Sequence, residues 1–159
     1  MEKIKNIFLI GIGGAGMSGI AEILLNSGYK VSGSDSSPSD VTSRLKKLGI
    51  NIFHSHNSKN LSEIDLIVYS SAISEDNPEI MHGKKIGIPV IKRAEMLANL
   101  MTMKKSIAIA GSHGKTTTTC ILAHIFTKCN LDPTYIIGGK IKSFESNASL
   151  GKLSLIHIS

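Results

Sequence analysis

The sequence contains few cysteines, few aromatic residues and no long apolar run. Its two cysteines, Cys120 and Cys129, lack the CxxC or cysteine–histidine spacing of a metal site, so we expect reduced thiols and no disulfide. No stretch reaches the roughly 18 uncharged apolar residues of a membrane helix, and the N-terminal segment lacks the small-residue cleavage site of a secretory signal. We therefore expect a cytoplasmic globular protein that does not bind a membrane.

The charge of the chain is positive but dispersed. The formal net charge is +6, and many of the lysines fall in short pairs instead of one stripe. The chain has three tyrosines, four phenylalanines and no tryptophan, whereas nucleic-acid binding needs clustered cations and stacking platforms. We expect no nucleic-acid partner and favour small anionic ligands. Hydrophobic residues make up 42% of the chain, which is sufficient for a folded core.

Apolar runs rich in β-branched residues alternate with helical patterns, which is typical of a parallel α/β architecture. Strands are predicted at residues 6–10, 30–32, 51–53, 66–69, 90–91, 106–110 and 135–137. Two helices are indicated by apolar residues at i, i+3, i+4 and i+7, namely Met17, Ile20, Ala21 and Leu24, and then Ala94, Leu97, Ala98 and Met101. A third helix contains Val41, Leu45 and Leu48 and ends at Gly49.

The segment Gly11–Gly16 fits the pattern GxGxxG, follows a predicted strand and opens a predicted helix. Glycines let the backbone approach a diphosphate, and the amides at the helix N-terminus point at the anion. An acidic residue after the second strand, here Asp35, can accept hydrogen bonds from ribose hydroxyls. The motif predicts a nucleotide that carries a diphosphate, and it does not by itself indicate NAD.

A second phosphate-type loop, Gly111–Thr116, lies between a predicted strand and a threonine-rich helix. It departs from the strict GxxxxGK[ST] pattern because Ile109 stands where the first glycine would be. Lys115 can still reach terminal phosphates, and the hydroxyl of Thr116 can ligate Mg²⁺. The loop predicts ATP and Mg²⁺ as cofactors, and we expect His113 to be held by the loop instead of acting as a catalyst.

A βα series ends and a new strand and loop begin near residue 103, which predicts two domains. The first is a Rossmann-like parallel-sheet domain over residues 1–103. The second, over residues 104–159, is the start of a P-loop ATPase-type domain.

Four separated motifs together resemble one family. The segments GIGGAGMSGIAEILLNSGYKVSGSD, VYSSAISEDNPEI, PVIKRAEMLANLM and GSHGKTTTT are similar, in this order, to the Mur ligases of bacterial peptidoglycan synthesis, over roughly residues 4–151. Within the family they are similar to the members that join L-alanine to UDP-N-acetylmuramate. The resemblance implies that the Rossmann-like domain holds the UDP part of the substrate and that the second loop holds ATP.

The resemblance also implies roles for individual residues. The substrate would be contacted by Gly11, Gly13, Gly14 and Gly16 at the diphosphate, Asp35 and His56 at the uridine, Ser70 and Ser71 near the phosphates, and Asn147 near the ATP site. ATP would be bound by Gly111, Ser112, His113, Gly114, Lys115, Thr116 and Thr117. Lys115 and Thr116 would be the catalytic residues, with Lys115 on the β and γ phosphates and Thr116 on Mg²⁺.

The implied reaction is an ADP-forming ligation. The muramoyl carboxylate attacks the γ-phosphate to give an acyl phosphate, and the amine of L-alanine then displaces phosphate. Positioning and charge neutralisation by the loop, Lys115 and Mg²⁺ would supply most of the acceleration.

The family chain is about three times as long as these 159 residues, so we expect an N-terminal fragment that binds the UDP substrate without ligase turnover. The tail 152–159 departs from the family pattern and is interpreted as a non-native end. We expect the segment after about residue 105 to lack partner strands and to be less stable, with sheet edges exposed.

Three alternatives remain open from the residues. A murein peptide recycling ligase shares both loops. An NAD-dependent oxidoreductase would use the first loop but leaves the second unexplained. A nucleotide-sensing module would bind without turnover.

Overall fold

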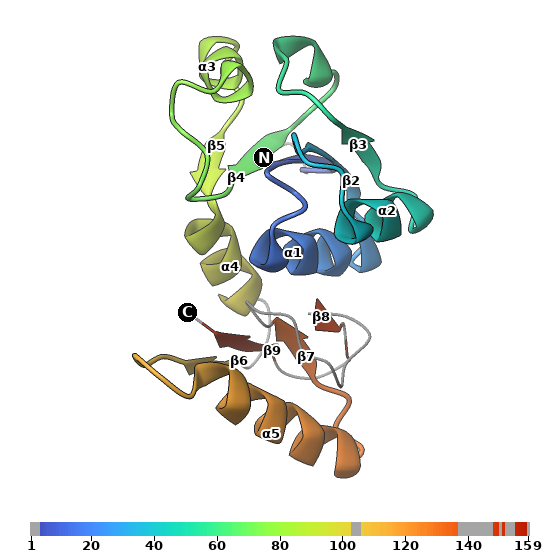
Figure 1. Ribbon diagram of the computed structural model, residues 1–159, viewed down its shortest axis with the longest axis vertical. Coiled ribbons are helices and arrows are strands. Elements are labelled where there is room, and N and C mark those ends of the chain that lie inside the picture. The colour runs from blue at the N-terminus through green and yellow to red at the C-terminus, as the bar shows by residue number, and fades with distance from the viewer. Residues whose placement is uncertain (1–3, 103–105, 137–147, 150, 152–154, 159) are drawn as a thin grey trace.

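Two sheets and the helices that cover them form a layered α/β molecule (Figure 1). The computed structural model describes residues 4–102, 106–136, 148–149, 151 and 155–158. The predicted domain boundary at residue 103 lies outside the described residues and stays a prediction.

The first sheet, called sheet A, is five-stranded and entirely parallel. Its order is β3-β2-β1-β4-β5, so the chain moves outward from β1 on one side and then returns to place β4 on the other side. This is the order of the first five strands of the Rossmann fold. The strands are β1 (Asn6–Ile10), β2 (Lys30–Ser34), β3 (Asn51–Phe53), β4 (Leu66–Tyr69) and β5 (Val90–Lys92).

Helices cover both faces of sheet A (Figure 1). On one face lie α1 (Ala15–Asn26), α2 (Asp40–Lys47) and α4 (Arg93–Thr102). On the other face lie the short 3₁₀ helix η1 (Ser58–Asn60) and α3 (Pro78–Lys85), which contact each other.

The core is organised by β1, whose side chains alternate between the two faces. Ile7 and Leu9 belong to the apolar cluster that contains the buried residues of α1, whereas Phe8 and Ile10 pack on the other side with Ile80 of α3. All four β1 side chains are almost completely buried, as expected for a central strand of a parallel sheet that is covered on both faces.

The second sheet, called sheet B, has the order β6-β9-β7-β8. Strands β6 (Ser106–Ile109), β9 (Leu155–Ile158) and β7 (Thr134–Ile136) are parallel, and β8 (Ala148–Ser149) is antiparallel to β7. Helix α5 (Lys115–Lys128) lies on the far side of sheet B, and β7 and β8 contact α1. Ile136 joins the main apolar cluster, so the two sheets share part of one core through α1.

The predicted α/β class and the seven predicted strands are confirmed, with end points that differ by at most two residues. The predicted apolar face of α1 is also confirmed, because its residues Met17, Ile20, Ala21 and Leu24 are all buried. None of the described helices is long and apolar enough to cross a membrane.

Three expectations about packing are wrong. Helix α4 buries Met96, Leu97 and Leu100, while Ala94 and Ala98 are exposed, because the larger side chains fill the space against sheet A. Leu48, predicted on the apolar face of the third helix, is the C-cap of α2 and is exposed. Sheet B does have partner strands, since the tail contributes β9 between β6 and β7.

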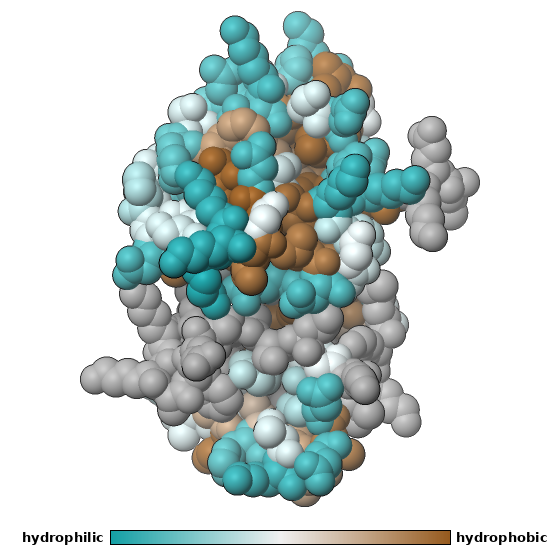
Figure 2. Space-filling model, turned by 90° about the vertical axis from the view of Figure 1, so that its right-hand side faces the viewer, coloured by the Kyte–Doolittle hydropathy of each residue, from teal (hydrophilic) through white to brown (hydrophobic). Residues whose placement is uncertain are grey.

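Few of the described apolar side chains in the half built on sheet B are buried. Thr119 and Ala123 are the buried residues of α5, whereas Ile121 and Ile125 of the same helix are exposed. On the face drawn in Figure 2, apolar side chains reach the surface around α5 as well as around sheet A.

We expect α5 to open more readily than α1, because opening α1 would expose a fully buried apolar stripe and opening α5 would not. Hydrogen exchange measured by mass spectrometry should show amides of α5 exchanging at least about tenfold faster than those of α1, a helix of similar length. Equal protection of the two helices would contradict this reading of the packing.

Candidate functional site at the carboxyl edge of sheet A

The polar residues singled out in the first half of the sequence lie at one edge of sheet A. Because all five strands are parallel, their carboxyl ends meet at the same edge, and the order reverses between β1 and β4. Ligands of open α/β sheets bind at such a reversal. The segments that follow the strands are the glycine turn after β1, Asp35 after β2, His56 after β3, Ser70 and Ser71 after β4, and Arg93 after β5.

The glycine turn is fastened to the end of β2. The amides of Gly11 and Ile12 donate to the carbonyl of Ser34 at 2.8 and 3.1 Å, and the amide of Gly14 donates to the carbonyl of Gly11 at 3.1 Å. Gly11 has φ of 75°, and a β-carbon there would lie 3.3 Å from Cβ of Ser70. The sequence therefore needs glycine at this position for both backbone conformation and space.

Asp35 contacts the same turn directly. Its Oδ2 accepts from the amide of Gly13 at 2.8 Å, and its Oδ1 accepts from the amide of Ser37 at 3.0 Å. A β-carbon on Gly13 would stand 2.8 Å from that Oδ2 and 2.9 Å from Cγ2 of Thr42. The structure thus brings two predicted substrate residues, Gly13 and Asp35, into contact.

The backbone N–H groups that remain available to a ligand follow the glycine turn and belong to the first turn of α1. Gly14 is the N-cap of this helix and supplies no side-chain cap. The helical amides of Gly16 and Met17 have no intrahelical partner by position, and no hydrogen bond occupies them within the described part of the chain. The N-terminus of α1 therefore presents the free N–H groups of Gly16 and Met17 at the carboxyl edge, where an anion is favoured by the helix dipole.

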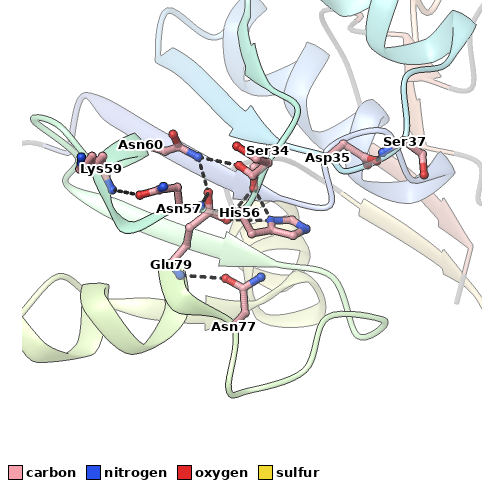
Figure 3. A network of polar contacts seen from close by, with 10 residues as sticks. Ser34, Asp35, Ser37, His56, Asn57, Lys59, Asn60, Asn77 and Glu79 are labelled. Carbon is pink, nitrogen blue, oxygen red and sulfur yellow. Dashed lines mark hydrogen bonds and ion pairs between the residues drawn. The ribbon is translucent and has the colours of Figure 1, made fainter.

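A buried polar network joins β2, the segment after β3 and α3 (Figure 3). Glu79 is fully buried, and its Oε2 accepts from Oγ of Ser34 at 2.6 Å and lies 3.0 Å from Nδ1 of His56. Its Oε1 accepts from the side-chain amide of Asn60 at 2.7 Å and from the backbone amide of Asn57 at 3.3 Å.

This network orients the predicted substrate residue His56. Because a carboxylate only accepts hydrogen bonds, Nδ1 of His56 carries the proton. Figure 3 shows the other ring nitrogen pointing away from Glu79. No motif in the sequence predicted a role for Glu79, Ser34 or Asn60. The local pattern that could have indicated Glu79 is the helix start Asn77-Pro78-Glu79, where Oδ1 of Asn77 accepts from the amide of Glu79 at 2.9 Å.

The two serines after β4 differ in position. Ser70 is half-buried, and its amide donates to the carbonyl of Ile10 at 3.2 Å, which places it beside the glycine turn. Ser71 is exposed. His54, in contrast, lies on the surface, where its Nε2 is 2.8 Å from Nζ of Lys46.

The second loop connects β6 to α5 and lies on sheet B. Gly114 is the N-cap of α5 with φ of 77°, and Gly111 has φ of 154°, so both adopt backbone conformations that favour glycine. Nζ of Lys115 donates to the carbonyl of Gly111, and it lies 3.5 Å from the carbonyl of Ser112. The ammonium group therefore folds back over the turn.

The other predicted residues of this loop are accessible. Ser112, His113, Thr116 and Thr117 are exposed around the N-terminus of α5. Asn147 lies outside the described residues. No group of three or more histidine, cysteine, aspartate or glutamate side chains suited to a metal ion occurs in the described ranges. The hydroxyl of Thr116 stays the predicted metal ligand.

Comparisons with known proteins agree on one family. A family model described as "Mur ligase family, catalytic domain" matches residues 6–105. The UDP-N-acetylmuramate–L-alanine ligase of Pelobacter propionicus is 56% identical over 94% of this chain and 33% of its own length, and that of Geobacter sulfurreducens is 55% identical over 94% and 32%. The chain thus spans about a third of the length of the curated relatives it matches.

Solved structures show the same arrangement. The UDP-N-acetylmuramate-alanine ligase from Thermotoga maritima is 33% identical, with a TM-score of 0.90 over 98% of this chain and 37% of that one. A UDP-N-acetylmuramate:L-alanyl-gamma-D-glutamyl-meso-diaminopimelate ligase from Neisseria meningitides is 28% identical, with a TM-score of 0.86 over 98% and 52%.

Replacing Glu79 should destabilise the protein strongly. Glu79→Ala leaves the buried hydroxyl of Ser34 and the half-buried side-chain amide of Asn60 without this acceptor, so we expect the free energy of unfolding to fall by about 3 kcal/mol in urea denaturation. The control is Glu75→Ala, because Glu75 is exposed and pairs with Lys84 at 3.7 Å, and it should change stability by less than about 0.5 kcal/mol. Similar stability of both variants would contradict the proposed role of the network.

Proposed function

The chain belongs to the Mur ligase family, and on this premise we propose that its two loops bind the nucleotides of a ligase that joins L-alanine to UDP-N-acetylmuramate with ATP. The observation that carries the proposal is the pair of separate glycine turns, each at a helix N-terminus on its own sheet. The names and the 53–58% identity of the curated relatives support the choice of substrates.

The first turn is proposed to hold the diphosphate of the UDP substrate. The free amides of Gly16 and Met17 are the proposed donors, and the glycines at 11, 13, 14 and 16 allow the diphosphate to approach the backbone. Asp35 and His56 lie to the β2 and β3 side of this turn, where the uridine is proposed to bind. Ser70 and Ser71 follow β4 on the other side of the turn, where they are proposed to contact the substrate phosphates.

The second loop is proposed to hold ATP, and the residues present fit this group. The turn from Gly111 to Gly114 places the Lys115 ammonium over backbone carbonyls, from which it can transfer to phosphate oxygens. Thr116 and Thr117 continue into the first turn of α5. The Thr116 hydroxyl is an oxygen donor of the kind Mg²⁺ prefers, and when bound Mg²⁺ would neutralise charge on the phosphates.

In the proposed reaction the muramoyl carboxylate attacks the γ-phosphate of ATP, which forms an acyl phosphate and releases ADP. The amine of L-alanine then attacks the acyl carbon, forms the amide and displaces phosphate. This chain's residues contribute positioning and positive charge, because phosphoryl transfer requires little covalent chemistry from a protein. The division into a UDP-substrate domain over 1–103 and an ATP domain from 104 is part of the proposal, as is a role for Asn147. A cytoplasmic location is consistent with it.

A recycling ligase is the less supported reading. Curated relatives at 53–58% identity are named for L-alanine, and the L-alanine ligase structure is 33% identical, whereas the recycling-type ligase structure from Neisseria meningitides is 28% identical. An oxidoreductase that uses NAD leaves the Lys115 loop without a role.

Calorimetry on the 159-residue chain tests the proposal. We expect UDP-N-acetylmuramate and Mg·ATP to bind independently, and Lys115→Met to weaken Mg·ATP by at least about tenfold, since it removes a charged hydrogen-bond donor, with UDP-N-acetylmuramate unchanged. Lys128→Met, at the exposed far end of the same helix, is the matched control and should bind both ligands like the wild type. Tight binding of NADH without binding of either expected ligand would refute the proposal.

A further inference from the structure

Arg93 lies against the first turn of α1. It is the first residue of α4 and follows β5 directly, so it belongs to the carboxyl edge of sheet A. Its guanidinium group packs on the Cα of Gly16, where a β-carbon would overlap Nη1 and stand 3.3 Å from Cζ. Because Gly16 has no side chain, the guanidinium group of Arg93 can lie next to the free amides of α1.

The Arg93 guanidinium has no partner within the described part of the chain. It makes no hydrogen bond or ion pair there, although the side chain is half-buried. The other arginine of the sequence, Arg44, is paired with Glu22 at 2.7 Å. Guanidinium groups at partly buried positions are normally paired with an anion. The unpaired N–H donors of Arg93 therefore indicate that an anionic ligand binds here.

The electrostatic surroundings strengthen this requirement. Arg93 stands at the N-terminus of α4, where the helix dipole disfavours a cation, and beside the N-terminus of α1, which is also positive. The dipoles of α1 and α4 therefore both disfavour a positive side chain at this position. Two positive helix ends and a guanidinium group converge on one place, and an anion bound between them removes the mutual repulsion.

We propose that Arg93 is a ligand of the substrate diphosphate and binds it together with the free amides of Gly16 and Met17. The inference rests on the proposed function, because the anion is the diphosphate of the uridine nucleotide. A planar guanidinium group donates two parallel hydrogen bonds to phosphate oxygens, which a lysine cannot do. Arg93 thereby closes the side of the cradle that the glycine turn leaves open.

The first test compares affinities for UDP and for uridine, which lacks the diphosphate, by calorimetry and competition. Arg93→Gln should weaken UDP by about tenfold or more and leave uridine unchanged, and Arg93→Lys should fall between it and the wild type. Lys92→Gln is the matched control, since it removes an exposed positive charge from the neighbouring position, and it should stay within about twofold of the wild type.

The second test needs no substitution. Phenylglyoxal modifies arginines, and mass spectrometry can follow Arg93 and Arg44 separately in one sample of the wild-type chain. UDP should protect Arg93 and leave the rate at Arg44 unchanged, whereas uridine should protect neither.

The outcomes separate the two proposals. If UDP binds the wild type and Arg93→Gln with equal affinity, or fails to protect Arg93 while bound, the role of Arg93 is refuted and the proposed function stands. If the wild-type chain binds no uridine nucleotide, both are refuted.

Discussion

The binding edge depends on the contact between the end of β2 and the turn that follows β1. The carbonyl of Ser34 accepts the amides of Gly11 and Ile12, and the carboxylate of Asp35 accepts that of Gly13. These bonds satisfy the donors of the turn internally and fix the direction in which α1 starts. The donors left for a ligand are consequently those of the first helical turn, and the proposed preference for an anion rests on that geometry.

The same strand end is held from the other face of the sheet. Oγ of Ser34 donates to the buried carboxylate of Glu79, which also receives Asn60 and orients His56. Ser34 therefore contacts the glycine turn through its backbone carbonyl and α3 through its side chain. This arrangement links the glycine turn, the end of β2 and α3, so the proposed nucleotide would meet groups already in position and lose less affinity to ordering them.

The sequence predicted what is local and missed what is distant. The glycine turns and the seven strands depend on patterns within a few residues, and the structure confirms them. Glu79 reaches Ser34 across 45 positions, and Arg93 reaches Gly16 only because β5 lies two strands from β1. No short motif encodes such contacts. The buried face of α4 was missed for a related reason, because side-chain size decided between two stripes of similar spacing.

The central claim is that the first amides of α1 receive the diphosphate of a uridine nucleotide. Amide chemical shifts of the ¹⁵N-labelled chain, recorded during addition of UDP, test it most directly. The account predicts that the largest changes fall on Gly16 and Met17 and that Gly111–Thr116 shows none. Changes confined to the second loop, or no change at the start of α1 at saturating UDP, would contradict it.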